Sequence, residues 1–304
     1  MRSVVTLAGL LLGWVAFLAL APASRGQDRL AEFFDPDEAK SRQLEVVEAL
    51  KLVCPDGAIT TDQQGKASGC RSCPKQTSFN GDDPDLSWDV KRAFTGHFTS
   101  TTAEDLILSG RGCEPHSENT GGSFVFVIDG SAVKLLRYDE ALIAERCRKF
   151  VVRDGPDMLV CTDDWGAQVT LWSYVYQVAF DGDGDSDVHR IFETIDLSRQ
   201  HYGIDFFTEK PTFIQESHLI GLKMEKSPTG FLLLVVTADF GKRFPTAEER
   251  KACEQGTPIP LALPTYRLKF VLHGNTFRPA EPTKALLKAF PKPEPPEDSY
   301  ATKH

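Results

Sequence analysis

The fold class is decided by the stretch Phe124-Val125-Phe126-Val127-Ile128-Asp129-Gly130-Ser131-Ala132-Val133-Lys134-Leu135-Leu136. An apolar run is followed by Asp-Gly, a dipeptide that two-residue hairpin turns prefer, and then by a second apolar run. Aromatic and β-branched residues, which fill both runs, are typical of strands. The stretch therefore predicts a β-hairpin.

Similar short apolar runs lie on both sides of this hairpin, at residues 106–108, 158–160, 169–180, 219–224, 231–236 and 266–272. Turn-forming residues separate them, as in Pro228-Thr229-Gly230 and Gly274-Asn275. We therefore expect an all-β domain of antiparallel sheets over residues 86–280.

The first 26 residues have the order of a secretory signal peptide. Arg2 precedes an apolar run from Val4 to Ala23, and the small residues Ala21-Pro22-Ala23-Ser24 form its exit. An uncleaved run of this length could instead anchor the chain in a membrane. We expect cleavage, and therefore a secreted or periplasmic protein with no membrane contact unless this segment stays uncleaved.

The net charge of the chain indicates which classes of partner it can bind. The formal net charge is −9, and it becomes −11 without residues 1–26, which contain two arginines and no acids. Nucleic-acid binding begins with a basic surface, so nucleic acid is not an expected partner. A protein or a carbohydrate ligand fits an acidic exported protein better.

Residues 27–85 are expected to form a helix and a cysteine-rich segment. The helix is predicted over 35–53, with Leu44, Val47, Leu50 and Val53 on its apolar face. At the other end, residues 281–304 are rich in Pro and Lys and predict a solvated tail with at most a short helix near 284–290.

Seven cysteines favour disulfide bonding in an oxidising compartment. Cys147 and Cys161 flank the turn Asp154-Gly155 almost symmetrically, so we predict a disulfide between them. One cysteine must remain unpaired, because the count is odd. The sequence leaves open the pairing of Cys54, Cys70, Cys73, Cys113 and Cys253.

Two segments share a polar loop that ends in Asp followed by three apolar residues: His97–Leu108 and Val152–Val160. Their aspartates, Asp105 and Asp157, are 52 residues apart. A third loop, at 180–188, reads Phe-Asp-Gly-Asp-Gly-Asp-Ser-Asp-Val. These segments resemble the FG-GAP or VCBS-type repeats of β-propellers, whose loops often hold calcium.

The resemblance covers about residues 94–280 and implies a degenerate or partial β-propeller. At about 40 to 50 residues per four-stranded blade, this length gives about four blades, which is few for a closed ring. An unrelated β-sandwich is the alternative fold.

The aspartate-rich loop is the candidate metal site, through Asp181, Asp183, Asp185 and Asp187. Alternating Asp and flexible residues lets several carboxylates converge on one calcium ion. The loop is not an EF-hand, because Ser186 replaces the turn Gly and Phe192 stands where the bidentate Glu belongs. The alternative is an acidic surface turn, in which Asp and Gly serve the backbone alone.

No recognised catalytic motif occurs in the sequence. Cys70-Arg-Ser-Cys73 has redox spacing, but its setting favours structural disulfides. Glu114 and His116, in the polar loop 112–122, are the alternative catalytic residues, as an acid–base pair.

These features favour an exported, non-catalytic binding or structural module that disulfides stiffen and calcium stabilises. The rival function is a secreted hydrolase or lyase that uses acid–base residues in the region 104–116, such as Glu104 or Asp105 beside His116.

Overall fold

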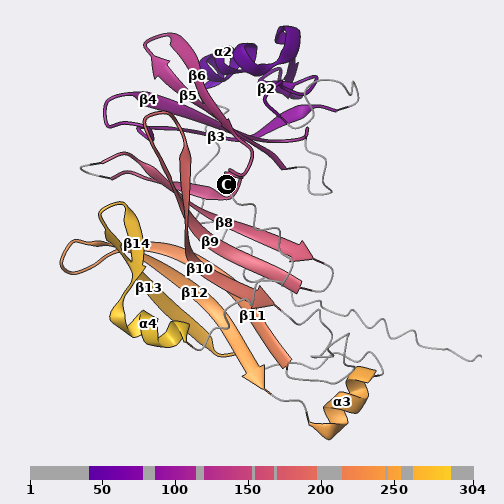
Figure 1. Ribbon diagram of the computed structural model, residues 1–304, viewed down its shortest axis with the longest axis vertical. Coiled ribbons are helices and arrows are strands. Elements are labelled where there is room, and N and C mark those ends of the chain that lie inside the picture. The colour runs from indigo at the N-terminus through magenta and orange to yellow at the C-terminus, as the bar shows by residue number, and fades with distance from the viewer. Residues whose placement is uncertain are drawn as a thin grey trace, which may run out of the picture.

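The computed structural model describes residues 41–77, 86–113, 120–152, 155–167, 170–196, 214–243, 246–254 and 263–288. These residues form three antiparallel sheets that follow one another along the long axis of the molecule (Figure 1). The all-β prediction is confirmed. No helix within the described ranges is long and apolar enough to span a bilayer.

The first sheet contains β1 (Ile59–Thr61), β2 (Ala67–Cys70), β3 (Trp88–Gly96), β4 (Glu104–Arg111), β5 (Thr120–Asp129) and β6 (Ala132–Asp139). The second sheet contains β7 (Cys147–Phe150), β8 (Met158–Ala167), β9 (Thr170–Phe180) and β10 (Ser186–Asp196). The third contains β11 (Ile214–Lys226), β12 (Leu232–Arg243), β13 (Thr265–His273) and β14 (Thr276–Pro279). The helical elements are α2 (Gln43–Val53), the 3₁₀ turn η2 (Pro55–Gly57), α3 (Ala247–Glu254) and α4 (Glu281–Leu287).

In every sheet, strands that are neighbours in sequence are neighbours in space. The second and third sheets are four-stranded meanders, and β3–β6 form another, extended at one edge by β1 and β2. The described strands close no ring, and three stacked sheets differ from a two-sheet sandwich. The predicted hairpin joins β5 to β6, where Gly130 has a φ of 61° that favours glycine.

Burial on both faces explains why several strands are continuously apolar. In β4, Ile107 packs toward the second sheet, whereas Leu106 and Leu108 pack on the opposite face against α2. The second sheet is likewise enclosed, because Leu159 faces the first sheet and Val160 faces the third. A strand with two buried faces reads as an unbroken apolar run.

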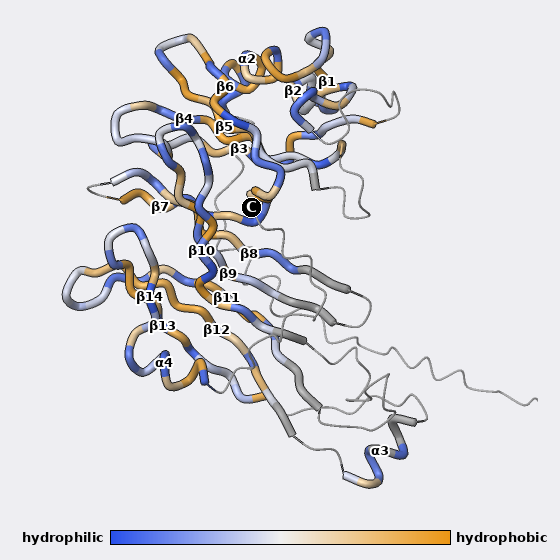
Figure 2. The backbone as a smooth tube through the Cα atoms, in the orientation of Figure 1, coloured by the Kyte–Doolittle hydropathy of each residue, from blue (hydrophilic) through white to orange (hydrophobic). Residues whose placement is uncertain are grey.

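The third sheet ends the stack of described sheets, and the second sheet encloses one of its faces. In β13, Leu268 and Phe270 are buried against the second sheet, and between and beside them Thr265, Arg267 and Lys269 are exposed. Figure 2 shows the apolar residues of this sheet, which is the lowest of the three sheets in that view. The exposed side chains make the outer face of the third sheet polar.

Helix α2 covers the outer face of the first sheet, but with a different face from the predicted one. Its buried residues are Val46, Ala49, Leu50 and Val53, and Leu44 is 83% exposed. Steps of three residues fall 60° short of a full helical turn each, so the predicted set drifts around the helix. Steps of three and four keep one stripe on the sheet.

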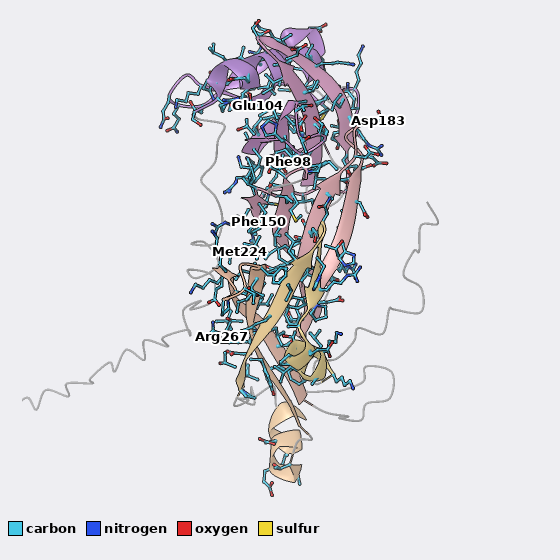
Figure 3. All side chains as sticks on the ribbon, turned by 90° about the vertical axis from the view of Figure 1, so that its left-hand side faces the viewer. Phe98, Glu104, Phe150, Asp183, Met224 and Arg267 are labelled. Atoms are coloured by element: carbon cyan, nitrogen blue, oxygen red, sulfur yellow. A yellow bond between two sulfur atoms is a disulfide. The ribbon has the colours of Figure 1, made fainter. Side chains whose placement is uncertain are left out.

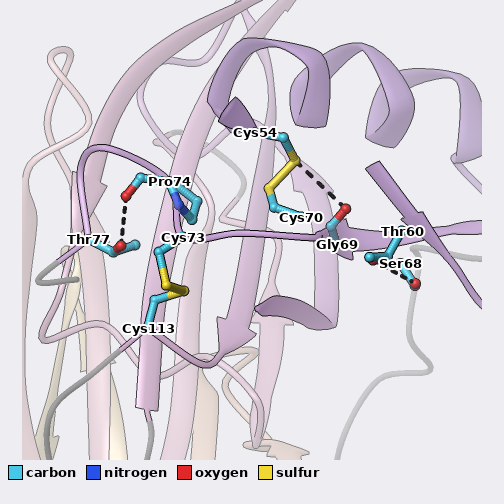
Figure 4. The surroundings of a disulfide bond; sticks show 9 residues. All are labelled: Cys54, Thr60, Ser68, Gly69, Cys70, Cys73, Pro74, Thr77 and Cys113. Atoms are coloured by element: carbon cyan, nitrogen blue, oxygen red, sulfur yellow. Dashed lines mark hydrogen bonds between the residues drawn. A yellow bond between two sulfur atoms is a disulfide. The ribbon is translucent and has the colours of Figure 1, made fainter. Parts of the chain in front are cut away.

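Six cysteines form three disulfides. The predicted pair Cys147–Cys161 joins β7 to β8, where the two residues face each other in the register. The other bonds are Cys54–Cys70 and Cys73–Cys113 (Figure 4). The two cysteines of the Cys-x-x-Cys segment therefore belong to different structural disulfides. The cysteine-rich segment is also part of the first sheet, because β2 pairs with β3.

Two buried polar side chains tie neighbouring sheets together. Asp157, just before β8, accepts a hydrogen bond from the His97 N–H at 2.9 Å, and its own N–H donates to His97 O at 2.7 Å. Gln177 of β9 accepts a hydrogen bond from the Phe277 N–H at 3.1 Å and donates to Asn275 O. Each tie fixes a loop of one sheet against the next.

Candidate functional site

The aspartate-rich loop connects β9 to β10 and is closed by its own hydrogen bonds. Asp181 Oδ1 accepts from the backbone N–H groups of Asp183 and Asp185, both at 2.9 Å. Asp185 Oδ1 also lies 3.0 Å from Arg137 Nη2 on β6. Gly184 has a φ of 80° and donates its N–H to Asp181 O. Turn geometry and one ion pair thus hold the loop against the first sheet.

This arrangement gives calcium few free ligands. Calcium takes six to eight oxygens, yet one Asp181 oxygen serves two N–H groups and Asp185 is paired with arginine. Over the described residues, no three His, Cys, Asp or Glu side chains gather as a metal site. Asp183 and Asp187 are exposed, and Figure 3 shows Asp183 at the surface near the first sheet. Calcium binding stays a prediction.

The alternative catalytic residues Glu114 and His116 lie outside the described residues. Cys113, which precedes them, follows the last residue of β4 by two positions. Glu104 and Asp105 begin the same strand, so at about 3.3 Å per residue they lie roughly 25 Å from Cys113. The strand therefore separates these acids from the cysteine next to Glu114.

Glu104 and Asp105 instead have structural contacts. Glu104 pairs with Arg42, beside the start of α2, at 2.6 Å. Asp105 is fully buried and accepts hydrogen bonds from the Thr99 N–H at 2.7 Å and the Thr99 hydroxyl at 2.9 Å. Burial raises the pKa of Asp105, and the hydrogen bonds from Thr99 oppose that rise. Both acids thus fix loops around the first sheet.

A pocket that the sequence did not predict lies at the end of the third sheet, where β13, β14 and α4 meet. Its volume is about 430 Å³, and we name it the basic pocket. It is lined by Val271, His273, Arg278, Pro279, Ala280, Glu281 and Lys284.

The positions of its lining residues follow from the local fold. His273 ends β13, the turn Gly274-Asn275 reverses the chain, and Arg278 lies opposite Val271 in the register. Ala280 N–H donates to Lys269 O at 2.9 Å, which directs α4 along the same edge. The first helical turn then places Lys284 at the pocket.

The basic pocket keeps an excess of positive charge. Lys284 pairs with Glu281, which cancels one cation. Arg278 is exposed and, within the described part of the chain, makes no ion pair. Guanidinium binds carboxylates, sulfates and phosphates by two parallel hydrogen bonds. The imidazole of His273 adds a further ring N–H donor, and Val271, Pro279 and Ala280 supply an apolar wall.

Sequence reasoning missed this pocket because its cations are spread over three elements and the chain as a whole is acidic. The alternation of Arg267, Lys269 and His273 with apolar residues was the available signal. It shows one polar face of a strand but not the helix that closes the pocket.

Comparison of the chain with family models, with curated proteins and with solved structures found no match.

Proposed function

We propose that the chain is an exported, non-catalytic binding module that holds an acidic ligand in the basic pocket. The observation that carries the proposal is the uncompensated Arg278 beside His273 and Lys284 in one concave site. A pocket with a few convergent polar groups on an apolar wall is the usual form of a ligand site. Among the residues that the structure describes, the pocket lining includes no Ser, Thr or Cys, so these residues offer no hydroxyl or thiol nucleophile.

The rigid stack suits a binding role. Sites on strands and helices are held more precisely than sites on long loops. Three disulfides also limit the conformational freedom of the unfolded chain and so stabilise the fold. The disulfides also support an oxidising compartment, in agreement with a secreted or periplasmic protein. Calcium at Asp181–Asp187 would stabilise the module away from the pocket, as a structural ion.

A binding titration tests the proposal. The chain from Gln27 onward, with its disulfides intact, is titrated with acetate, sulfate and glucuronate by calorimetry. A charge-assisted hydrogen bond contributes about 1.5 to 3 kcal/mol, so Arg278→Ala should weaken binding about tenfold or more. Arg71→Ala, which removes another exposed arginine, is the matched control and should change nothing.

Two results would count against this function. If no anion binds saturably, or if both variants bind equally, the basic pocket is not a ligand site. If a bound molecule is instead consumed, the hydrolase or lyase alternative is favoured.

A further inference from the structure

The basic pocket is one end of a longer cationic surface on the outer face of the third sheet. Successive rows of this face carry Arg267, then Lys269 with Lys223 two strands away, then Arg278, then His273. Same-face rows are about 6.7 Å apart, so four rows span roughly 20 Å. We name Lys223, Arg267, Lys269 and Arg278 the cationic face.

The cationic face is accessible and poorly neutralised. The side chains of Lys223 and Arg267 are 70% and 61% exposed. Glu225 is the carboxylate among these rows, and it lies 3.2 Å from Lys223 and 3.3 Å from Arg267. Lys269 and Arg278 make no ion pair within the described ranges. The face therefore retains positive charge on a chain that is acidic overall.

Glu225 reports the electrostatic character of this surface. A hydrogen bond from Lys223 and the charges of Lys223, Arg267 and Lys269 hold the pKa of Glu225 below its usual value. At this position between the rows, the ionised carboxylate is therefore favoured over the protonated acid. The row next to Arg267 carries an acid, Asp239, which accepts a hydrogen bond from Thr265 at 2.6 Å and interrupts the positive charge.

We infer that the cationic face binds a linear acidic polysaccharide, with one acidic group in the basic pocket and the following groups along β13. The inference rests on the proposed function. Arg267, Lys269, Arg278 and His273 follow one another from row to row along β13 and its neighbour β14, and such a line of charges suits an extended polymer with repeated carboxylates or sulfates. A compact anion would use the pocket alone.

Other polyanions fit this surface less well. Nucleic acid would meet a negatively charged chain, whose charge repels phosphates at long range. A protein partner usually needs a desolvated aromatic or apolar centre. Val235, the apolar residue between Lys223 and Lys269, is itself only 1% exposed, so it offers a partner little apolar surface.

Oligogalacturonates of one to six residues test the inference by calorimetry at low and high salt. Each additional exposed ion pair adds about 0.5 kcal/mol, so three further pairs should raise the affinity about tenfold from monomer to tetramer. High salt should reduce this gain, because exposed charges are screened. The uncharged control is maltotetraose, which should not bind.

The decisive variant is Arg267→Ala/Lys269→Ala, compared with Arg71→Ala/Lys134→Ala, which removes the same charge from the first sheet. The first variant should keep the affinity for the monomer and lose the increase with length. Retained monomer binding also shows that this variant is folded. The control variant should keep both properties.

The outcomes separate the two proposals. Monomer binding through Arg278 without any gain from length would overturn the polymer inference and leave the proposed function standing. No binding of any oligomer or of the monomer would remove both. Equal affinity for poly-glutamate of matched charge would overturn the assignment to a carbohydrate.

Discussion

Replacing Gln177 by leucine removes the polar tie between the second and third sheets while nearly preserving side-chain volume. Gln177 is 2% exposed, and its side-chain oxygen accepts the N–H of Phe277 at 3.1 Å. Among the described strands, β14 pairs with β13 alone, and the Phe277 N–H is directed to Gln177 of the second sheet and not to β13. Leucine would leave this buried N–H without a hydrogen bond.

The expected cost follows from the two lost hydrogen bonds. An unsatisfied buried N–H costs about 1 to 3 kcal/mol, and the bond from Gln177 to Asn275 O adds about 1 kcal/mol. The free energy of unfolding should therefore fall by about 2 to 4 kcal/mol, which lowers the thermal midpoint by about 4 to 16 °C. The matched control is Gln64→Leu, at an exposed turn position, with an effect within about 0.5 kcal/mol.

Urea unfolding gives the stability, and amide hydrogen exchange gives the location. The Phe277 amide should exchange faster in Gln177→Leu, whereas amides of the first sheet should be protected as in the wild type. Unchanged stability, or lost stability with unchanged exchange at Phe277, would refute the reasoning.

Three further predictions concern other parts of the molecule. The double variant Cys147→Ala/Cys161→Ala should lose about 3 kcal/mol of stability in urea, because the loop between the two cysteines is no longer closed in the unfolded chain. An unchanged urea midpoint would contradict a structural disulfide. Since burial raises the pKa of Asp105, its contribution to stability should be full below about pH 3.9 and should be lost as pH rises through the folded-state pKa. Asp105→Asn should flatten that dependence, and parallel pH profiles of the two proteins would oppose this. Excess calcium should raise the thermal midpoint, because a ligand at a hundred times its dissociation constant adds about 2.7 kcal/mol of stability. Asp183→Ala should abolish this rise, and Asp129→Ala should not. An unchanged midpoint in the wild type would remove the calcium prediction.

Features set by neighbouring residues could be predicted from the sequence. The turn at Asp129-Gly130 and the pairing of Cys147 with Cys161 depend on a few positions and on strand alternation. Strands with two buried faces, such as β4 and β8, were equally clear, because burial on two faces produces unbroken apolar runs. Short or mixed strands, such as β1, β2 and β10, were not predicted.

Features set by distant residues could not be predicted. Cys73 pairs with Cys113 because the chain after β2 returns beside the end of β4, which spacing does not reveal. The basic pocket depends on how α4 meets β13 through the hydrogen bond from the Lys269 N–H to the Thr283 hydroxyl at 2.7 Å. Helix α3 was also missed, since its eight residues carry no apolar stripe.

The ordered succession of the sheets has a consequence for how the protein is made. Every described strand pairs with a neighbour in sequence, and none of the three disulfides links two sheets. Their cysteines are at most 40 positions apart in the sequence. Local pairing of this kind lowers contact order and speeds folding. As the chain enters an oxidising compartment, the first sheet can fold and oxidise once Asp139 has entered, before the rest has followed. Maturation can then proceed one sheet at a time from the N-terminal end, without rearrangement of earlier disulfides.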